Sequence, residues 1–286
     1  MTSESGKLDW IKARRRYQRR CDWRNSPQSS WMKERVVPTQ GPMISFAALG
    51  RQGMKKDFRY FKALRHDLFY RALAYRGRLP LLTLGDAANH FAWKVCPEKL
   101  GQNSTVVSAG VGRDISFELA LVHLFNCRIL LLDPSPTGIS TMSLTKNQHP
   151  NIQFLPLALT GRDGSVTMCE PGNPEEGSYS SLVGVTRGPK VEGISLSSLM
   201  KRHGLDKIDL LKIDIEGSEY NVIESVLKEK LKITQICLEY HNQVLPGIKT
   251  SWTAGSLLKL WFAGWRLISK WGSNHTLWND RFGGLS

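Results

Sequence analysis

The stretch from Val106 to Asp133 constrains the fold more than any other part of the sequence. It begins with an apolar, β-prone run, passes through Gly110 and Gly112, continues into a helix-like segment and ends in a second apolar run closed by Asp133. This order predicts a strand, a glycine turn, a helix and a second strand, with a ligand at the carboxyl edge. Glycines let a backbone approach a bound nucleoside, and an acid after the second strand can accept hydrogen bonds from ribose hydroxyls. A nucleoside cofactor is therefore the first hypothesis.

The glycine turn alone does not decide which nucleoside is bound. A dinucleotide fingerprint would place a third glycine at position 115, where this chain has Ile115, so an NAD site is disfavoured. Asp133 lies 21 residues after Gly112, the spacing expected for an intervening helix and strand. The alternative interpretation is that the glycines only make a tight turn and that Asp133 caps the next helix.

From Thr105 onward the sequence alternates between strand and helix patterns. Strands are predicted over 105–109, 128–133, 152–157, 208–214, 233–240, 265–270 and 275–279, and helices over 114–125, 139–148, 196–203, 219–230 and 254–263. Strands separated by helices indicate a parallel sheet covered on both faces. The turn Gly272-Ser273-Asn274 joins the last two strands into an antiparallel hairpin at the sheet edge. After the third strand, only a polar excursion to about residue 190 is predicted.

The positive charge of the chain is concentrated near its N-terminus. The 286 residues carry a formal net charge of +14, and residues 1–78 contain 19 Lys and Arg against 6 Asp and Glu. An amphipathic helix is predicted over 55–75. We expect a basic, partly helical extension (1–80) and a main domain (81–286). Such asymmetry favours a partner with an acidic surface, either an anionic membrane or nucleic acid, bound through residues 1–78.

Cysteine usage and hydropathy limit the compartments that suit this chain. The five cysteines are scattered and include no C-x-x-C pair, which favours a reducing compartment. No apolar run has the length of a membrane-spanning helix, and Glu4, Asp9 and the cluster from Arg14 to Arg20 occupy the place of a secretory signal core. A cytoplasmic protein is expected, with peripheral attachment to a membrane as an option.

A second acidic segment is predicted at the same edge of the sheet. Asp209 to Glu219 reads DLLKIDIEGSE, so Asp214 ends a predicted strand and Glu216 follows it shortly before a helix. Three carboxylates within six residues at the edge of a parallel sheet are more than a helix cap requires. Glu219 is interpreted as a first-turn acid that favours the helix dipole. Asp214 and Glu216 are the acids expected to face the cofactor or the acceptor.

The next strand ends in CLEYH, where Glu239 and His241 lie on the same side. His241 could take a proton from an acceptor hydroxyl at neutral pH, or it could be only a hydrogen-bonded strand end. A divalent ion held by Asp214 and Glu239 is considered as an alternative, but no metal site is predicted.

These motifs together resemble a known family. GVGRDISFEL, LLLDPSP, NIQFLPLALTGRDGSV, SSL, LLKIDIEGSEYNVIE and CLEYH, in this order over about residues 100–280, are similar to the FkbM family of class I S-adenosylmethionine-dependent methyltransferases. The resemblance implies a Rossmann-like, seven-stranded, mostly parallel sheet with a terminal antiparallel hairpin. It also implies methyl transfer from S-adenosylmethionine, usually to a hydroxyl oxygen of a sugar, glycolipid or small-molecule metabolite.

The resemblance also assigns roles to residues by position. The two glycines would border the methionine part of the cofactor, Asp133 would bind the ribose hydroxyls, and Ala158 would lie near the adenine. Asp214 would face the methionine amino group or the acceptor. The residues expected to bind the cofactor are Gly110, Gly112, Asp114, Asp133, Ala158, Asp214 and Glu216, and those expected to act in catalysis are Asp214, Glu239 and His241.

The sequence departs from the family pattern at two places. Arg113-Asp114 stands where many members are rich in glycine and asparagine, and Asp133-Pro134 stands where many have Glu-Pro. The shorter acid keeps the carboxylate but reduces its reach. The polar segment 177–188 is expected over the acceptor side of the site.

The predicted activity is S-adenosylmethionine-dependent O-methylation of a small-molecule or glycan acceptor. Two alternatives remain open: an NAD-linked oxidoreductase, and a catalytically degenerate adaptor that binds nucleic acid or a membrane through its basic extension. The identity of the acceptor and the oligomeric state are not determined by the sequence.

Overall fold

The computed structural model describes residues 66–169, 179, 188–242 and 249–283. The chain divides into two compact units, Met1–Ala72 and Leu73–Ser286, and almost all of the first lies outside the described residues. The predicted boundary after residue 80 and the predicted partners of the basic extension therefore stay predictions. Residues 66–73 are helical, as predicted for the C-terminal part of the helix over 55–75.

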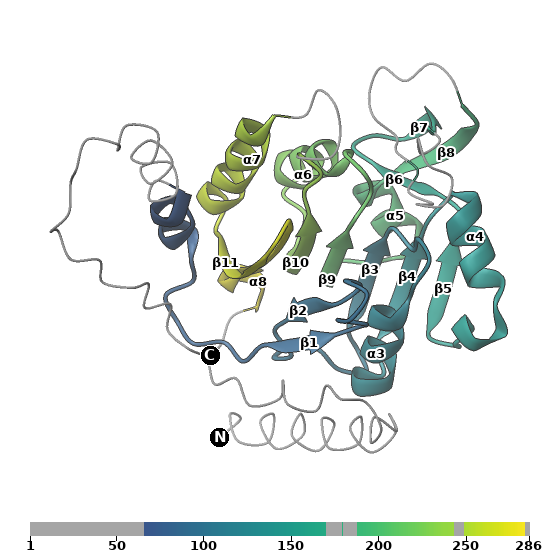
Figure 1. Ribbon diagram of the computed structural model, residues 1–286, viewed down its shortest axis with the longest axis horizontal. Helices are drawn as coiled ribbons and strands as arrows, with labels where there is room; N and C mark the ends of the chain where they lie inside the picture. The colour runs from purple at the N-terminus through teal and green to yellow at the C-terminus, as the bar shows by residue number, and fades with distance from the viewer. Residues whose placement is uncertain (1–65, 170–178, 180–187, 243–248, 284–286) are drawn as a thin grey trace, which may run out of the picture. The chain divides into compact units, whose positions relative to one another are not determined.

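A seven-stranded sheet forms the centre of the second unit (Figure 1). In spatial order its strands are β11 (Trp265–Trp271), β12 (Asn274–Asn279), β10 (Ile233–Glu239), β9 (Ile208–Ile213), β3 (Thr105–Ala109), β4 (Arg128–Leu132) and β5 (Ile152–Leu155). Neighbouring strands are parallel except at β12, which is antiparallel to both β11 and β10. The predicted fold class, a Rossmann-like, mostly parallel sheet with a terminal antiparallel hairpin, is confirmed.

Helices connect the strands, as the alternation in the sequence predicts. They are α3 (Ser116–Phe125), α4 (Pro136–Ser143), the 3-10 turn η3 (Thr145–Asn147), α5 (Leu196–Arg202), α6 (Glu219–Lys228), α7 (Thr250–Phe262) and the short α8 (Asp280–Gly283). Helix α3 packs against β4 and β1, whereas α6 contacts both α5 and α7 (Figure 1). Among the described helices, none is both long enough and apolar enough to cross a bilayer.

Helix α4 begins at Pro136 rather than at the predicted residue 139. The hydroxyl of Ser135 accepts a hydrogen bond from the backbone N–H of Gly138 at 3.0 Å, which caps the helix. Pro136 suits the first helical position, because an N–H there has no partner within the helix. The helix therefore starts directly after the acid that closes β4, and it fixes the chain at that edge of the sheet.

The sequence does not predict two small sheets that flank the main one. β6 (Ala158–Thr160), β8 (Lys190–Ser195) and β7 (Gly164–Thr167) form a three-stranded sheet in the region of the predicted polar excursion. β1 (Leu82–Leu84) and β2 (Trp93–Val95) form an antiparallel pair before the main sheet. Most of these strands are only three or four residues long, too short for a period of two to be visible in the sequence.

The central strands are buried on both faces. All six residues of β9 are buried, and in β3 and β4 only the first residue is not. Parallel strands between two helical layers are expected to be apolar throughout, so the buried Lys212 on β9 and Ser108 on β3 stand out. Both polar side chains lie close to the edge where the strands end and the candidate site begins.

Candidate active site

A cavity of about 290 Å³ lies at the carboxyl edge of the main sheet. Its walls come from the segments that follow β3, β4, β5, β9 and β10, together with the loop between β1 and β2. The structure brings all the predicted site residues to this cavity: Gly110, Gly112, Asp114, Asp133, Ala158, Asp214, Glu216, Glu239 and His241. Tyr179, from the segment expected over the acceptor side, also lines it.

The glycine turn after β3 needs its glycines for two different reasons. Gly110 has φ of +93°, and a Cβ there would overlap the backbone carbonyl oxygen of Asp214. Gly112 has φ of +54°, but a Cβ there would meet no atom within 4 Å. Gly110 is therefore required because Asp214 lies too close for a side chain. Gly112 is favoured only by its positive φ, and the space beside it is open.

Asp133 organises the backbone around this turn. Its Oδ2 accepts hydrogen bonds from the N–H groups of Val111 at 2.9 Å and Gly112 at 3.1 Å. Its Oδ1 accepts from the N–H of Ser135 at 2.8 Å, and a Cβ on Gly138 would overlap the carboxylate. These contacts are the ones expected from the alternative interpretation of the sequence, in which Asp133 stabilises the glycine turn and the start of the next helix. Asp133 also lines the cavity. Binding of ribose by its carboxylate stays a prediction.

Two other predicted cofactor residues differ in how they are held. The Oδ1 of Asp114 accepts hydrogen bonds from the backbone N–H and the hydroxyl of Ser116, at the start of α3. Ala158 is the buried first residue of β6 and lies in the cavity wall beside Leu157 and Leu159. Asp114 therefore steadies the end of the turn, whereas Ala158 contributes to an apolar wall.

A buried lysine beneath the cavity is not predicted from the sequence. The Nζ of Lys212 donates a hydrogen bond to the carbonyl oxygen of Gly110 at 2.6 Å and lies 5.7 Å from the centroid of the Trp93 ring. It is also 3.9 Å from Glu118 Oε1, and Glu118 in turn accepts from the Ser108 hydroxyl at 2.6 Å. Burial raises the pKa of Glu118, and the charge of Lys212 acts in the opposite direction.

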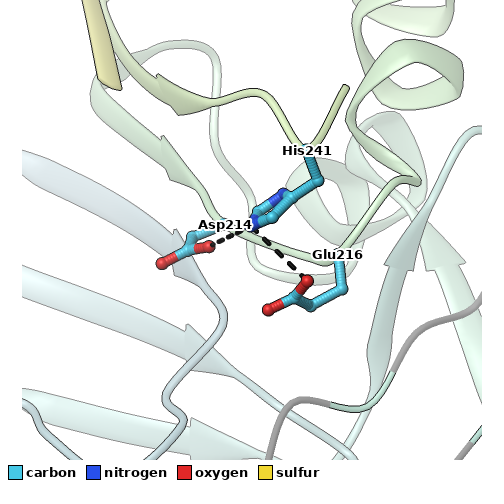
Figure 2. A group of neighbouring side chains, drawn as sticks. All are labelled: Asp214, Glu216 and His241. Atoms are coloured by element: carbon cyan, nitrogen blue, oxygen red, sulfur yellow. Dashed lines mark ion pairs between the residues drawn. The ribbon is translucent and has the colours of Figure 1, made fainter. Parts of the chain in front are cut away.

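Three side chains converge at the ends of β9 and β10 (Figure 2). The Nε2 of His241 lies 3.6 Å from Asp214 Oδ1 and 3.5 Å from Glu216 Oε2. On the opposite side of the ring, Nδ1 lies 2.6 Å from Oε1 of Glu219. The sequence predicts Glu219 only as a first-turn acid, but its side chain is fully buried and fixes the orientation of His241.

Comparison with known proteins identifies the family. Residues 74–249, more than half of the chain, match the Methyltransferase FkbM domain. The chain belongs to the FkbM methyltransferase family. The resemblance predicted from the sequence motifs is therefore confirmed.

Two curated relatives of this FkbM chain are named probable methyltransferase-like protein 24. The Homo sapiens protein is 24% identical over 193 residues, which cover 64% of this chain and 46% of the relative. The Rattus norvegicus protein is 33% identical over 159 residues, which cover 54% and 38%. The FkbM chain thus spans less than half the length of these relatives. Among solved structures, precorrin-6y C5,15-methyltransferase from Geobacter metallireducens is 13% identical over 64% of this chain and 83% of that chain, with a TM-score of 0.38.

The surroundings of His241 in the FkbM domain limit its chemistry. Burial lowers its pKa, but the hydrogen bond and charge of Glu219, together with the two carboxylates facing Nε2, outweigh burial and raise the pKa to about 10. An imidazole with this pKa holds its proton at neutral pH. The predicted role of His241 as a base therefore requires that the surrounding negative charge be offset.

Glu239 lies at the same edge but in a different hydrogen-bond environment. Its Oε1 accepts a hydrogen bond from the hydroxyl of Ser273 at 2.6 Å. Burial, and then the charge of Asp214, raises the pKa of the Glu239 carboxyl group. The hairpin between β11 and β12 thus holds Glu239, whereas α6 holds His241 through Glu219.

Sequence reasoning misses Lys212, Glu118 and Glu219 as parts of this site. A signal for the first is present, because Lys212 is a lone charge within the apolar run LLKI. A charged residue inside a fully buried strand needs a partner, so it indicates a polar cluster. No comparable signal marks Glu219, since an acid in the first helical turn is common for reasons of helix stability alone.

Proposed function

We propose that this FkbM domain transfers a methyl group from S-adenosylmethionine to a hydroxyl oxygen of a sugar, glycolipid or small-molecule acceptor. One observation carries the proposal. A single cavity joins the glycine turn and Asp133, here called the donor side, to Asp214, Glu216, Glu239 and His241, here called the acceptor side. Membership of the FkbM methyltransferase family supports methyl transfer as the chemistry.

The residues of the cavity fit the chemical parts of S-adenosylmethionine. The open space beside Gly112 leaves room for the cofactor next to the turn. The apolar wall from Leu157 to Leu159 suits a purine ring, which gains from burial of its faces. The carboxylates of Asp214 and Glu216 suit the positively charged sulfonium and amino groups.

The reaction makes limited demands on the protein. The acceptor oxygen attacks the methyl carbon in line with the carbon–sulfur bond, which breaks with its electron pair passing to sulfur. The hydroxyl proton leaves to a base. Holding donor and acceptor in line can supply most of the rate acceleration. Asp214, Glu239 and His241 are proposed to receive or direct the proton, since they lie together on the acceptor side.

Calorimetric titration of the full chain tests the donor part of the proposal. We expect saturable binding of S-adenosylmethionine and no heat of binding with NAD. Absence of binding to S-adenosylmethionine would contradict the proposal, and binding of NAD alone would favour the oxidoreductase alternative. Family membership already weighs against that alternative.

Transfer of a radiolabelled methyl group in cell extracts tests the acceptor part. We expect label in a hydroxylated sugar, glycolipid or small molecule, with mass spectrometry placing the methyl group on oxygen. A product methylated on nitrogen or carbon would contradict the O-methyltransferase proposal while leaving methyl transfer intact. The adaptor alternative stays a prediction, because it rests on a basic extension that lies mostly outside the described residues. The cytoplasmic location, expected from cysteine usage and hydropathy, also stays a prediction.

A further inference from the structure

We propose that Asp214, Glu216 and His241 form a binding site for a divalent metal ion, at which the acceptor hydroxyl would bind next to the methyl donor (Figure 2). Binding of the ion stands on the geometry of these three residues alone. Its part in the reaction rests on the proposed function.

The three ligand atoms converge from two segments, the connection between β9 and α6 and the end of β10. One oxygen each from Asp214 and Glu216 and one nitrogen of His241 lie within 4.8 Å of one another. Asp214 directly follows β9, Glu216 lies in the turn before α6, and His241 follows the end of β10 (Figure 2). Because both segments leave the ends of adjacent parallel strands, the main sheet holds the ligands in place.

The distances favour ligands of a shared ion over direct hydrogen bonds. His241 Nε2 is 3.6 Å from Asp214 and 3.5 Å from Glu216, whereas charged N–H···O bonds are about 2.7–2.9 Å long. Two ligands that each lie about 2.1 Å from one ion are about 3.0–3.4 Å apart when their angle is between 90° and tetrahedral. Small side-chain movements would therefore bring all three atoms onto one ion.

Behind His241 lies the partner that a metal-binding imidazole usually has. Nδ1 contacts Oε1 of Glu219 at 2.6 Å, and the same oxygen accepts from the N–H of Gly217 at 3.0 Å. This contact fixes the ring so that Nε2 points toward Asp214 and Glu216, as in a carboxylate–histidine–metal arrangement.

The burial of Glu219 is a further indication of positive charge at this site. Its side chain is fully buried, and its Oε2 has no hydrogen-bond partner among the described residues. A buried carboxylate with an unsatisfied oxygen is costly unless positive charge lies nearby. The buried cation of the cavity floor, Lys212, is engaged with Gly110 and lies 3.9 Å from Asp214 and from Glu118.

The donor set indicates the class of ion and its open positions. One imidazole nitrogen with two carboxylate oxygens suits Mn²⁺ or Zn²⁺, whereas Ca²⁺ takes about 6–8 oxygen ligands. Three protein ligands leave coordination positions for the acceptor hydroxyl, whose pKa a bound ion would lower. The proposed ligands differ from the pair considered from the sequence, Asp214 and Glu239. Glu239 is left out because its carboxylate accepts a hydrogen bond from Ser273.

Binding of Mn²⁺ to the full, chelator-treated chain provides the test. The electron paramagnetic resonance signal of free Mn²⁺ measures the unbound ion during titration, with no need for methyl transfer. We expect one equivalent to bind to the unmodified chain. The variants Glu216→Gln and His241→Gln should bind about 100-fold more weakly or not at all, and Glu219→Gln about 10- to 100-fold more weakly.

Two further variants separate the proposal from its rivals. Glu224→Gln, on the exposed face of α6, should bind Mn²⁺ like the unmodified chain, since Glu224 pairs with Lys259 at the surface. Equal binding by all variants would place the ion elsewhere and overturn the proposal. Loss of binding in Glu239→Gln but not in Glu216→Gln would also overturn it. Absence of Mn²⁺ binding to the unmodified chain would also overturn the proposal, because the cluster would then consist of ion pairs only. Thermal unfolding of each variant confirms that loss of binding is not loss of folding.

Methyl transfer and ion binding can fail separately in this design. Mn²⁺ binding without any methyl transfer would refute the proposed function and keep the metal site. Methyl transfer at an unchanged rate after chelation, with no Mn²⁺ binding, would refute the metal site and keep the function.

Discussion

The donor side and the acceptor side of the cavity are built by different means. On the donor side a single carboxylate, Asp133, binds backbone N–H groups of the glycine turn and of the α4 start. On the acceptor side, side chains from α6 and from the segments that follow β9 and β10 contact one another. Asp214, Glu216 and Glu219 all surround His241. Backbone geometry therefore shapes the donor side, whereas contacts between side chains from different segments shape the acceptor side.

The two sides meet at Gly110. Its backbone passes so close to Asp214 that no side chain fits, and its carbonyl oxygen accepts from Lys212, which lies 3.9 Å from the Asp214 carboxylate. A change at this junction should therefore affect both sides together, whereas changes farther out should affect only one.

Gly110→Ala is expected to have the largest effect. The new Cβ would overlap the carbonyl oxygen of Asp214 at a φ of +93°, so strain and overpacking should lower the free energy of unfolding by about 4 kcal/mol. Gly112→Ala is the matched control and should cost only about 1–2 kcal/mol, because its Cβ meets no atom within 4 Å. Urea unfolding measures both. Equal losses would show that the two sides are not coupled through Gly110.

Lys212→Met tests whether the buried lysine joins the two sides. The change leaves Glu118 fully buried without its cation, which should lower the free energy of unfolding by about 3–5 kcal/mol. Replacing Glu118 as well, in Glu118→Gln/Lys212→Met, should recover part of the loss. Lys259→Met is the control, since Lys259 and its partner Glu224 are both exposed, and the change should alter stability by about 0.5 kcal/mol or less. A loss in Lys212→Met no larger than in the control would contradict the coupling.

His241→Ala separates the acceptor side from the donor side. Turnover should fall by about 100-fold or more, as expected when a group that directs a proton or holds a reactant is removed. The affinity for S-adenosylmethionine should persist, because the donor-side contacts of Asp133 remain. Steady-state kinetics and calorimetry measure the two effects. Full activity in this variant would leave His241 with a structural role only.

Asp133→Ala makes the converse test. We expect about 10-fold weaker binding of S-adenosylmethionine, because the lost carboxylate would no longer accept hydrogen bonds from the ribose hydroxyls or from the backbone N–H groups of the turn. Asp206→Ala, at an exposed aspartate, serves as the control and should bind normally. Calorimetry measures both affinities. Normal binding by Asp133→Ala would contradict the ribose assignment.

Most of the main domain follows from its sequence pattern. Strand β3 lies at the predicted residues 105–109, and the hairpin of β11 and β12 turns at Gly272 as expected. The sheet of β6, β7 and β8 does not follow, because β6 pairs in parallel with β8, and partners such as Ala158 and Gly193 are 35 residues apart in the sequence. Local periodicity contains no information about such a pairing.

The order of strands and helices, the glycine turn and the set of side chains at the carboxyl edge all follow from the amino-acid sequence. These features depend on local requirements: a period of two or 3.6, a positive φ, or an acid after a strand. Three contacts depend instead on the fold as a whole: Gly110 against Asp214, Lys212 beneath the turn, and Glu219 against His241. Each of these contacts joins residues from different strands or helices, so packing of the sheet, rather than any local pattern, determines the charge around the acceptor side.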